Sequence, residues 1–236
     1  MDFSEALHER VSVRAYLDKP VPAEVLAAIL DDARHCASWS NTRGYVIALA
    51  HGERLERLKA AYLQAWDDAV TLRRGKARAF VKAALRGKLP SGDFKTWKRY
   101  PPELRERQVA NGKRYYGHLE IAREDHAKRD LWERKNLEFF GAPVVGFVFV
   151  HRDILPFSAQ DAGIMLQNLM LSATAHGLGT VALGTLATWR HPVDAEFEIP
   201  EDYMLITGCA LGYPDWDAHV NDFRAEHPAI PLAKPR

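Results

Sequence analysis

An α+β layered domain is the fold class that the sequence predicts, and three observations favour it. The chain has 236 residues, enough for a sizeable core, and its 47% hydrophobic and 27% charged residues are ordinary for a globular protein. Its apolar residues fall into helix-length stretches with one apolar face and into separate short runs of strand length. No internal repeat or low-complexity stretch interrupts this mixture, so we expect helices packed on a sheet.

The N-terminal part of the chain predicts two helices, a loop, a strand and a third helix. Residues 3–9 form a short helical pattern, and a helix that begins near Pro22 carries apolar residues at i and i+4 spacing. The turn-rich stretch CASWSNTRG, residues 36–44, predicts a loop. The apolar run 45–50 has the length of a strand, and residues 55–69 then place apolar side chains on one helical face.

Residues 71–140 differ in composition from the rest of the chain. They contain three prolines and several aromatic residues, and positions 71–100 hold ten lysines and arginines against a single acid, Asp93. We expect helical pieces around a proline-broken loop. Because long insertions in compact domains are often functional, this segment is a candidate for a functional insertion rather than a simple connection.

The clearest helix is expected over residues 158–176. Ser158 and Asp161 have the spacing of a capping box at its start, and Gly177 is a natural stop after its end. Its apolar residues spread beyond one face, which predicts a helix that is buried nearly all round.

Three more strands and an unusual tail complete the expected fold. The run VVGFVFV at 144–150, a short run at 180–183 and the run MLITGCAL at 204–211 each have strand length and apolar composition. After Pro214 the chain is proline-bearing and poor in core residues. We expect such a tail to lean on another surface, such as a second subunit.

Composition and charge indicate a non-membrane protein in a reducing compartment, but they do not indicate a function. A formal net charge of +1 says little about partners, and no apolar run is long enough to span a bilayer. The start of the chain is polar and acidic, unlike a signal peptide. Cys36 and Cys209 form no metal spacing and are expected as buried free thiols, which fits a reducing cytoplasm. The ten histidines are scattered, with no pair at i, i+4, so we expect no metal site.

Four stretches carry candidate binding chemistry. Arg10, Ser12 and Arg14 alternate, so on an extended segment two guanidiniums and a hydroxyl face one way, an arrangement suited to a phosphate. The loop ASWSN at 37–41 can present hydroxyl and amide groups to a ligand.

The other two candidates lie later in the chain. In HGLGTVALGTLA, at 176–187, glycine allows a flat ligand to approach the backbone closely. Arg224 lies near the C-terminus. Each of the four stretches has a plain alternative: a solvated segment, an ordinary loop, a helix-to-strand connector and a surface charge.

Together, in this order, the stretches resemble the FMN-dependent nitroreductase family. The arginine segment matches its R-x-S-x-R/K motif, and ASWSNTRGY takes the place of its PSxxNxQPW loop, with Ala37 where the family has proline. The sequences GLGT and FFGAP, and a late G-Y-P followed by arginine, also match. The resemblance covers nearly the whole chain.

The resemblance implies a three-layer α/β/α fold with a mixed, mainly antiparallel sheet, forming a homodimer with two FMN sites at its interface. Residues 1–236 would form one domain, with 71–140 as a helical lid and 214–236 as a tail packed on the partner. Hydride would pass from NAD(P)H to the flavin N5 and then to a nitroaromatic, quinone or conjugated acceptor by a ping-pong mechanism. No catalytic side chain is assigned.

The resemblance also implies roles for particular residues. Arg10, Ser12 and Arg224 would hold the FMN phosphate, and Arg14 would reach the pyrimidine edge, where a cation stabilises the anionic reduced flavin. The loop residues Ala37, Ser38 and Asn41 would come from the other subunit. The connector residues that would lie against the ring are Ala182, Leu183, Gly184 and Thr185.

Several alternatives remain open from the sequence. The same fold serves reductive dehalogenases, flavin-destroying enzymes and biosynthetic dehydrogenases. Outside enzymes, the basic segment 71–100 with its aromatics could bind single-stranded nucleic acid, although we expect no nucleic-acid partner and no membrane. The same cations could form a solvated face, or a lid that favours anionic acceptors over neutral ones.

Overall fold

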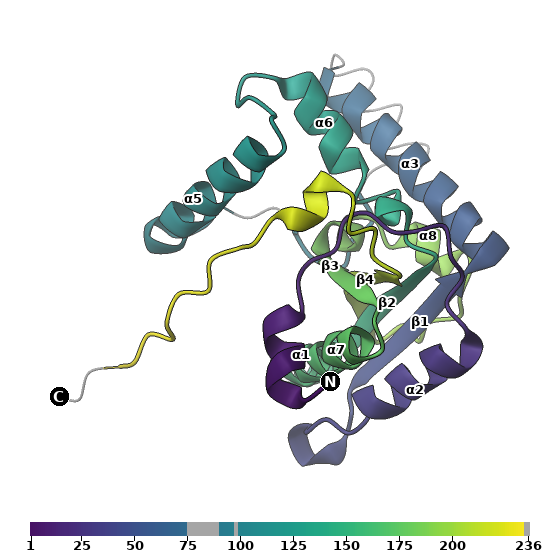
Figure 1. Ribbon diagram of the computed structural model, residues 1–236. Coiled ribbons are helices and arrows are strands. Elements are labelled where there is room, and N and C mark those ends of the chain that lie inside the picture. The colour runs from purple at the N-terminus through teal and green to yellow at the C-terminus, as the bar shows by residue number, and fades with distance from the viewer. Residues whose placement is uncertain (75–89, 97–98, 234–236) are drawn as a thin grey trace.

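A four-stranded sheet forms the centre of the molecule (Figure 1). The computed structural model describes residues 1–74, 90–96 and 99–233. The strands pair in the order β1-β2-β4-β3, and every neighbouring pair is antiparallel. Their bounds are β1 (Tyr45–His51), β2 (Val144–His151), β3 (Gly179–Leu183) and β4 (Tyr203–Gly212).

The sheet expected as mixed is therefore antiparallel throughout its four named strands. Among the described residues, the parallel component is a single isolated bridge between Ser12 and Thr180, which adds the N-terminal segment to the edge of β3. Each strand lies within a residue or two of the range that its apolar run predicts.

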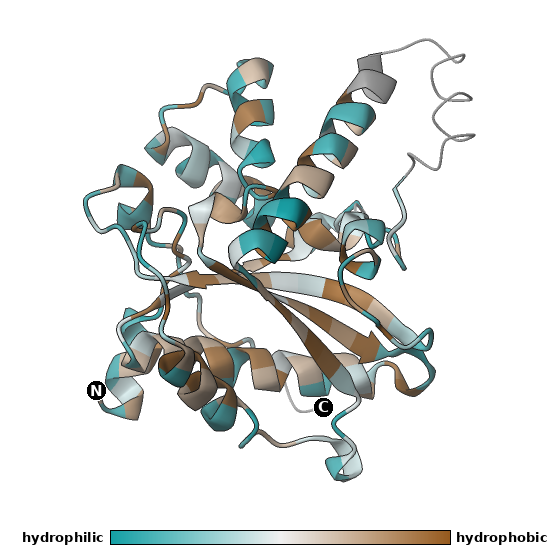
Figure 2. Cartoon of the chain, turned by 90° about the vertical axis from the view of Figure 1, so that its right-hand side faces the viewer, coloured by the Kyte–Doolittle hydropathy of each residue, from teal (hydrophilic) through white to brown (hydrophobic). Residues whose placement is uncertain are grey.

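Helices cover both faces of the sheet, which gives the three layers expected (Figure 2). On one face α7 (Phe157–Ala175) contacts the sheet, and α1 (Phe3–Glu9) and α2 (Ala23–Ala33) pack against α7. On the other face α3 (Gly52–Arg74) packs on β1, β2 and α8 (His191–Asp194). Two further helices are α5 (Pro102–His118) and α6 (His126–Arg134). Short 3-10 turns are η1 (Trp39–Asn41), η2 (Phe139–Gly141), η3 (Arg152–Ile154), η4 (Gly184–Thr188) and η5 (His219–Asp222).

The central strand β2 shows why two layers form. Side chains alternate across a strand, so a strand that is apolar at every position needs cover on both sides. In β2, Val145, Phe147 and Phe149 belong to the core beneath α3, whereas Val148 and Val150 belong to the core beneath α7. All of these side chains are buried.

The long helix α7 begins differently from the prediction. It starts at Phe157 after Pro156, with no side-chain cap, so Ser158 lies inside the helix and the expected capping box is wrong. The Ser158 hydroxyl donates to the His151 carbonyl at 2.8 Å, and the Asp161 carboxylate accepts from the Trp39 amide at 3.0 Å. Long-range partners therefore take both side chains away from the helix end.

The end of α7 and the two thiols agree with the sequence. Gly177 follows the helix with a φ of +75°, a conformation that favours glycine. Cys36 and Cys209 are both free and buried. Burial raises the pKa of the Cys209 thiol to about 12, so this sulfur is an inert part of the core.

The segment 71–140 contributes both surface helices and core. Helices α5 and α6 contain no fully buried residue, but Leu137, Phe139 and Phe140 at the end of the segment pack in the core beneath α3. Much of the basic stretch lies outside the described residues, namely Lys76, Arg78, Lys82, Arg86, Lys88 and Lys98. In the part of the chain that the structure describes, no helix is long and apolar enough to cross a membrane.

Candidate functional site

The N-terminal segment after α1 is extended, as the alternation of Arg10, Ser12 and Arg14 predicts. The Val13 amide donates to the Thr180 carbonyl at 3.0 Å, and the Val13 side chain is buried. A Cβ on Gly179 would lie 2.5 Å from Val13 Cγ2, so glycine is what allows this close approach. Because Val13 points inward, the flanking side chains of Ser12 and Arg14 are directed away from the core.

Asn221 joins the two ends of the chain. Its side-chain oxygen accepts from the Arg14 amide at 2.7 Å, and its amide nitrogen donates to the carbonyls of Ala15 and Asp215 at 2.9 and 2.7 Å. Its backbone carbonyl accepts from the Arg224 guanidinium at 2.6 Å. This buried amide therefore brings Arg14 and Arg224 to one place.

The three arginines of the predicted phosphate site share one property. Within the described part of the chain, Arg10, Arg14 and Arg224 form no ion pair with a carboxylate. The guanidinium contacts of Arg224 are to the carbonyls of Asn221 and Phe223. Guanidiniums without a carboxylate partner are well suited to hold a phosphate, because their donor forks match its oxygens.

Helix α5 fastens onto this arginine cluster from outside. The Arg14 guanidinium lies 4.8 Å from the centre of the Tyr115 ring, and the Tyr115 hydroxyl accepts from the Trp132 indole at 3.1 Å. Burial raises the pKa of Tyr115, which keeps this hydroxyl protonated. The cation over its ring thus has a fixed platform.

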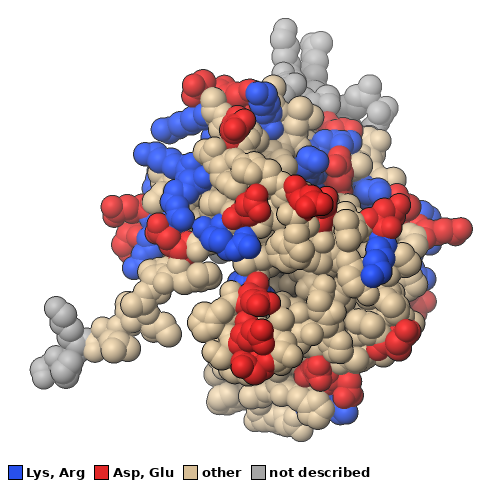
Figure 3. All heavy atoms as spheres, in the orientation of Figure 1, with Lys and Arg blue, Asp and Glu red and all other residues tan. Residues whose placement is uncertain are grey.

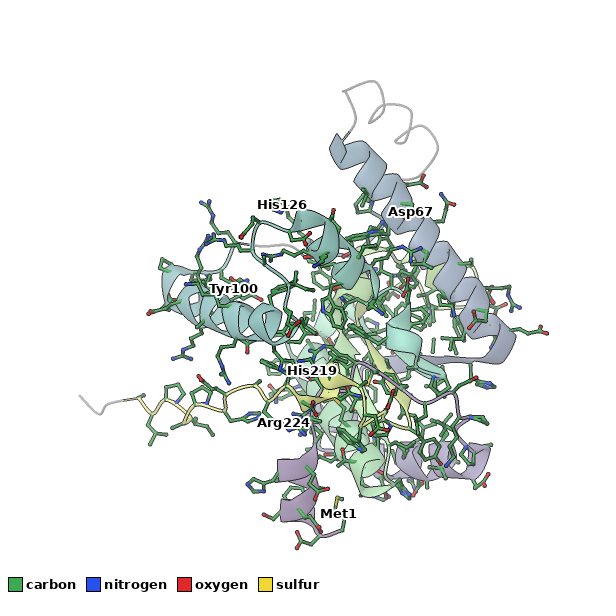
Figure 4. All side chains as sticks on the ribbon, turned by 45° about the horizontal axis from the view of Figure 1, so that its top comes forward. Met1, Asp67, Tyr100, His126, His219 and Arg224 are labelled. Carbon is green, nitrogen blue, oxygen red and sulfur yellow. The ribbon has the colours of Figure 1, made fainter. Side chains whose placement is uncertain are left out.

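A second set of contacts ties α5 to the segment that carries Arg224. His118 and His219 stack at 4.0 Å, and each ring nitrogen Nε2 lies within 2.9 Å of the other residue's carbonyl oxygen. Arg114 donates to the Arg224 carbonyl at 3.2 Å and pairs with Glu226. Figure 4 shows His219 and Arg224 together beside α5, where the chain leads into its extended tail.

The loop 37–41 has a strained, outward-facing form. Ser40 and Asn41 have φ values of 49° and 56°, and the Trp39 amide is held by the buried carboxylate of Asp161. Trp39 is 54% exposed and stacks on Phe157 at 4.1 Å. The Ser38 hydroxyl is buried and has no hydrogen-bond partner among the described residues, while Ala37 and Asn41 are exposed. Unpartnered polar atoms and aromatic surface together suit a binding loop.

One chain does not bring this loop to the arginines. The loop is bonded to Asp161 near the start of α7, whereas Ser12 pairs with Thr180, beyond the end of that helix at Ala175. The rise of a helix separates Asp161 from Ala175 by about 21 Å. The predicted site residues therefore form two groups at opposite ends of α7.

The connector after β3 supplies an uncovered stretch of backbone. Leu183 is buried, whereas Ala182 and Gly184 are exposed and Thr185 is half-buried. A Cβ on Gly184 would meet no atom of the described residues within 4 Å. A cavity of about 730 Å³ lies beside Gly184 and Thr185, within the usual size range of ligand sites.

Helix α5 links this cavity to the arginine cluster. Gln108 of α5 lines the cavity, and the ring of Tyr115 in the same helix lies under the Arg14 guanidinium. The two positions lie about 10 Å apart along the helix axis. A flat ring system of this length reaches from the cavity to Arg14.

Sequence reasoning missed three residues of this region. Asn221 gives no local signal, Asp161 has the spacing of a helix cap, and Tyr115 is one of many aromatics in its segment. A buried amide three residues before a predicted phosphate-binding arginine is visible only once the path of the chain is known.

Known proteins with this fold carry the same arrangement of elements. The sequence pattern of the nitroreductase family matches residues 7–213. The 4-nitrobenzoate reductase of Pseudomonas putida is 31% identical over 228 residues, which cover 94% of this chain and 90% of that protein. Nitroreductase NfnB of Mycolicibacterium smegmatis is 31% identical over 215 residues, covering 91% and 84%.

Solved structures agree with the sequence comparisons. The FMN- and NADPH-dependent nitroreductase NfnB from Sphigopyxis sp. strain HMH superimposes with a TM-score of 0.83 at 29% identity, covering 97% of this chain and 96% of that one. The FMN-dependent NfnB of Mycobacterium smegmatis in complex with NADPH gives 0.82 at 27% identity, covering 99% and 100%. With the family pattern matched over most of its length, this chain belongs to the nitroreductase family.

Proposed function

We propose that the protein is an FMN-dependent oxidoreductase that transfers hydride from NAD(P)H to a nitroaromatic, quinone or conjugated acceptor. The observation that carries this proposal is that Asn221 holds Arg14 and Arg224 together, both without an ion pair among the described residues, in a chain that also leaves the backbone at Gly184 open. The relatives named as nitroreductases, and the solved ones named as FMN- and NADPH-dependent, support the same chemistry.

The residues present fit FMN. Arg10, Ser12 and Arg224 offer charge-assisted donors for its phosphate, and Arg14 offers a cation for the pyrimidine edge of the ring. The open backbone over Ala182–Thr185 lets a flat ring approach without meeting a side chain at Gly184. When bound, FMN accepts a hydride from NAD(P)H and passes it to the acceptor, while the protein binds, orients and shields the reactants.

The first test is the content of the purified protein. We expect FMN to copurify with the chain and to be reduced by NADPH or NADH in the absence of oxygen. Adding a nitroaromatic should then reoxidise it, and the reduced organic product should be identified. Protein that neither holds FMN nor binds it after reconstitution would contradict the proposal.

Two copies of the chain complete each site in this proposal. Because Ser38 and Asn41 lie at the far end of α7 from the arginines, a second copy must supply the loop Ala37–Asn41 to each arginine cluster. Exposed apolar side chains that a second copy could bury lie on α1, where Phe3 is 71% exposed, and on the tail, where Leu232 is 87% exposed. Figure 3 shows the tail standing away from the body of the molecule.

The remaining assignments form part of the same proposal. Residues 1–236 make one domain, in which the segment 71–140, apart from its core residues Leu137, Phe139 and Phe140, acts as a lid over the flavin face and 214–236 pack on the partner subunit. The two free thiols suit a reducing compartment, so we place the protein in the cytoplasm.

Mixed dimers provide a direct test of the shared site. Arg224→Ala removes the phosphate contact, and the double variant Ser38→Ala, Asn41→Ala removes the loop contacts. If each site takes these groups from different chains, a heterodimer of the two variants has one intact site and one doubly altered site. We therefore expect purified heterodimers, isolated with two different tags, to recover FMN binding and activity that both variant homodimers have lost.

A heterodimer that does not recover FMN binding or activity would contradict the shared site. If loop and arginines acted within one chain, the heterodimer would hold two damaged sites and remain as weak as its parents. A wild-type protein that is monomeric by light scattering and still holds stoichiometric FMN would also contradict the shared site. The heterodimer of one variant with wild type serves as the positive control.

A further inference from the structure

The cavity beside Gly184 and Thr185 has one wall with two positive charges and no negative charge among its described residues. The segment before α5 supplies Lys95 and Arg99 to it, and none of its described lining residues is an acid. Neither cation forms a hydrogen bond or ion pair with another described residue. By contrast, Arg57 on α3 is paired with Glu196 at 2.8 Å.

The wall that carries these cations is anchored to the end of the sheet. The Asp93 carboxylate, whose side chain is 9% exposed, accepts from Arg190 at 3.0 and 3.2 Å and from the Leu205 amide at 2.8 Å. The Gly92 amide donates to the Thr188 carbonyl at 3.0 Å, and a Cβ on Gly92 would lie 2.3 Å from the Ala187 carbonyl oxygen.

The anchor continues on the other side of Lys95. The Thr96 and Thr188 hydroxyls lie 3.0 Å apart, so the backbone at Lys95 lies between two anchored residues, Asp93 and Thr96. The backbone that carries Lys95 is therefore held at the cavity, whereas its exposed side chain is free to reach an anion.

Flat apolar groups lie in the same cavity. Phe94 and Tyr100 are 38% and 54% exposed, and Ile206 also lines the cavity. Figure 4 shows Tyr100 beside α5, away from the body of the sheet. Aromatic rings with exposed faces suit a flat ligand that stacks against them. A neutral aromatic acceptor would use only these surfaces and leave both cations unmatched.

We infer that the acceptor is an aromatic carboxylate, and that Lys95 and Arg99 are the residues that select its charge. This inference rests on the proposed function, because it names the substrate class of that same site. The carboxylate pairs with the two cations at the mouth of the cavity, and the acceptor ring stacks on the flavin ring that the connector Ala182–Thr185 holds in our proposal. A phosphate of the dinucleotide co-substrate has related chemistry, so the experiment must separate the two anions.

A matched pair of acceptors tests the charge preference. Steady-state kinetics would compare 4-nitrobenzoate with neutral 4-nitrobenzamide for wild type, Lys95→Gln, Arg99→Gln and the double variant. We expect wild type to favour the anion in kcat/KM by roughly 5- to 30-fold, the size expected from two partly exposed ion pairs. The preference should shrink at high salt and vanish in the double variant, with the amide unchanged. Lys59→Gln, a change at a half-buried residue of α3 that does not line this cavity, is the control.

Binding of unreactive analogues gives a second readout that does not need turnover. Calorimetry of the holoprotein should show tighter binding of benzoate than of benzamide, with the difference lost in the double variant. Equal treatment of anion and amide by wild type, or a preference that survives the double substitution, would overturn the inference.

Two other outcomes point to different faults. In the double variant, the KM for NADPH could rise while the kcat/KM ratio of the two acceptors stays as in wild type. That result would assign the cations to the co-substrate phosphate and would also overturn the inference. Reduction of neither acceptor by wild type would instead count against the proposed function, and the benzoate titration would still judge the charge preference by itself.

Discussion

Replacing Arg224 with alanine is expected to weaken FMN binding by about 10- to 100-fold, because a charge-assisted contact to phosphate contributes about 1.5–3 kcal/mol. Arg10→Ala should have an effect of similar size, since its guanidinium is also unpaired among the described residues. Titration of apoprotein with FMN, followed by flavin fluorescence, measures both. The FMN affinity of Arg224→Lys should lie between those of wild type and Arg224→Ala, because lysine keeps the charge but loses the donor fork.

Two controls separate phosphate binding from general damage. Arg34→Ala removes an exposed arginine whose partner is Asp31, and it should leave the FMN dissociation constant unchanged. Thermal melts should show that Arg224→Ala remains folded despite losing its contacts to the carbonyls of Asn221 and Phe223. Unchanged FMN affinity in both Arg10→Ala and Arg224→Ala would remove the phosphate assignment.

The second large effect is expected at Asn221. Asn221→Ala removes three hydrogen bonds of a side chain that is buried, and it leaves the Arg14 amide and the carbonyls of Ala15 and Asp215 without that partner. An unsatisfied buried polar group costs about 1–3 kcal/mol, and such costs do not simply add. We expect the free energy of unfolding to fall by about 2–4 kcal/mol.

Denaturant unfolding of the apoprotein at one fixed concentration measures this loss, since the stability of the dimer that we propose would depend on concentration. Asn221→Asp keeps the acceptor for Arg14 but loses both donors, so its loss should differ from that of alanine. The exposed Asn111 of α5 provides a control, because Asn111→Ala should change stability by no more than about 0.5 kcal/mol. Wild-type stability in Asn221→Ala would show that water replaces the amide at no cost.

Asn221→Ala should also weaken FMN binding, although it contacts no phosphate in our proposal. The Arg14 segment and the Arg224 segment are joined through this residue, so its loss frees both cations from a common position. A variant that is less stable but binds FMN as wild type does would show that the two arginines keep their places without it.

The sequence by itself determined those features that repeat along neighbouring residues. The apolar run of β2 predicts a strand covered on both faces, and the alternation of Arg10, Ser12 and Arg14 predicts an extended segment with its polar side chains turned one way. Gly177 predicts the end of α7. These inferences succeed because backbone geometry fixes which near neighbours share a face or end a helix.

Only the tertiary structure decided what meets across the chain. The spacing of Ser158 and Asp161 suits a helix cap, yet their partners are the His151 carbonyl and the Trp39 amide. Asp93, the single acid in a basic stretch, is the anchor of the cavity wall, and Asn221 joins Arg14 to Arg224. A polar side chain bonds whichever group the folded backbone brings within reach, and no local period encodes that path.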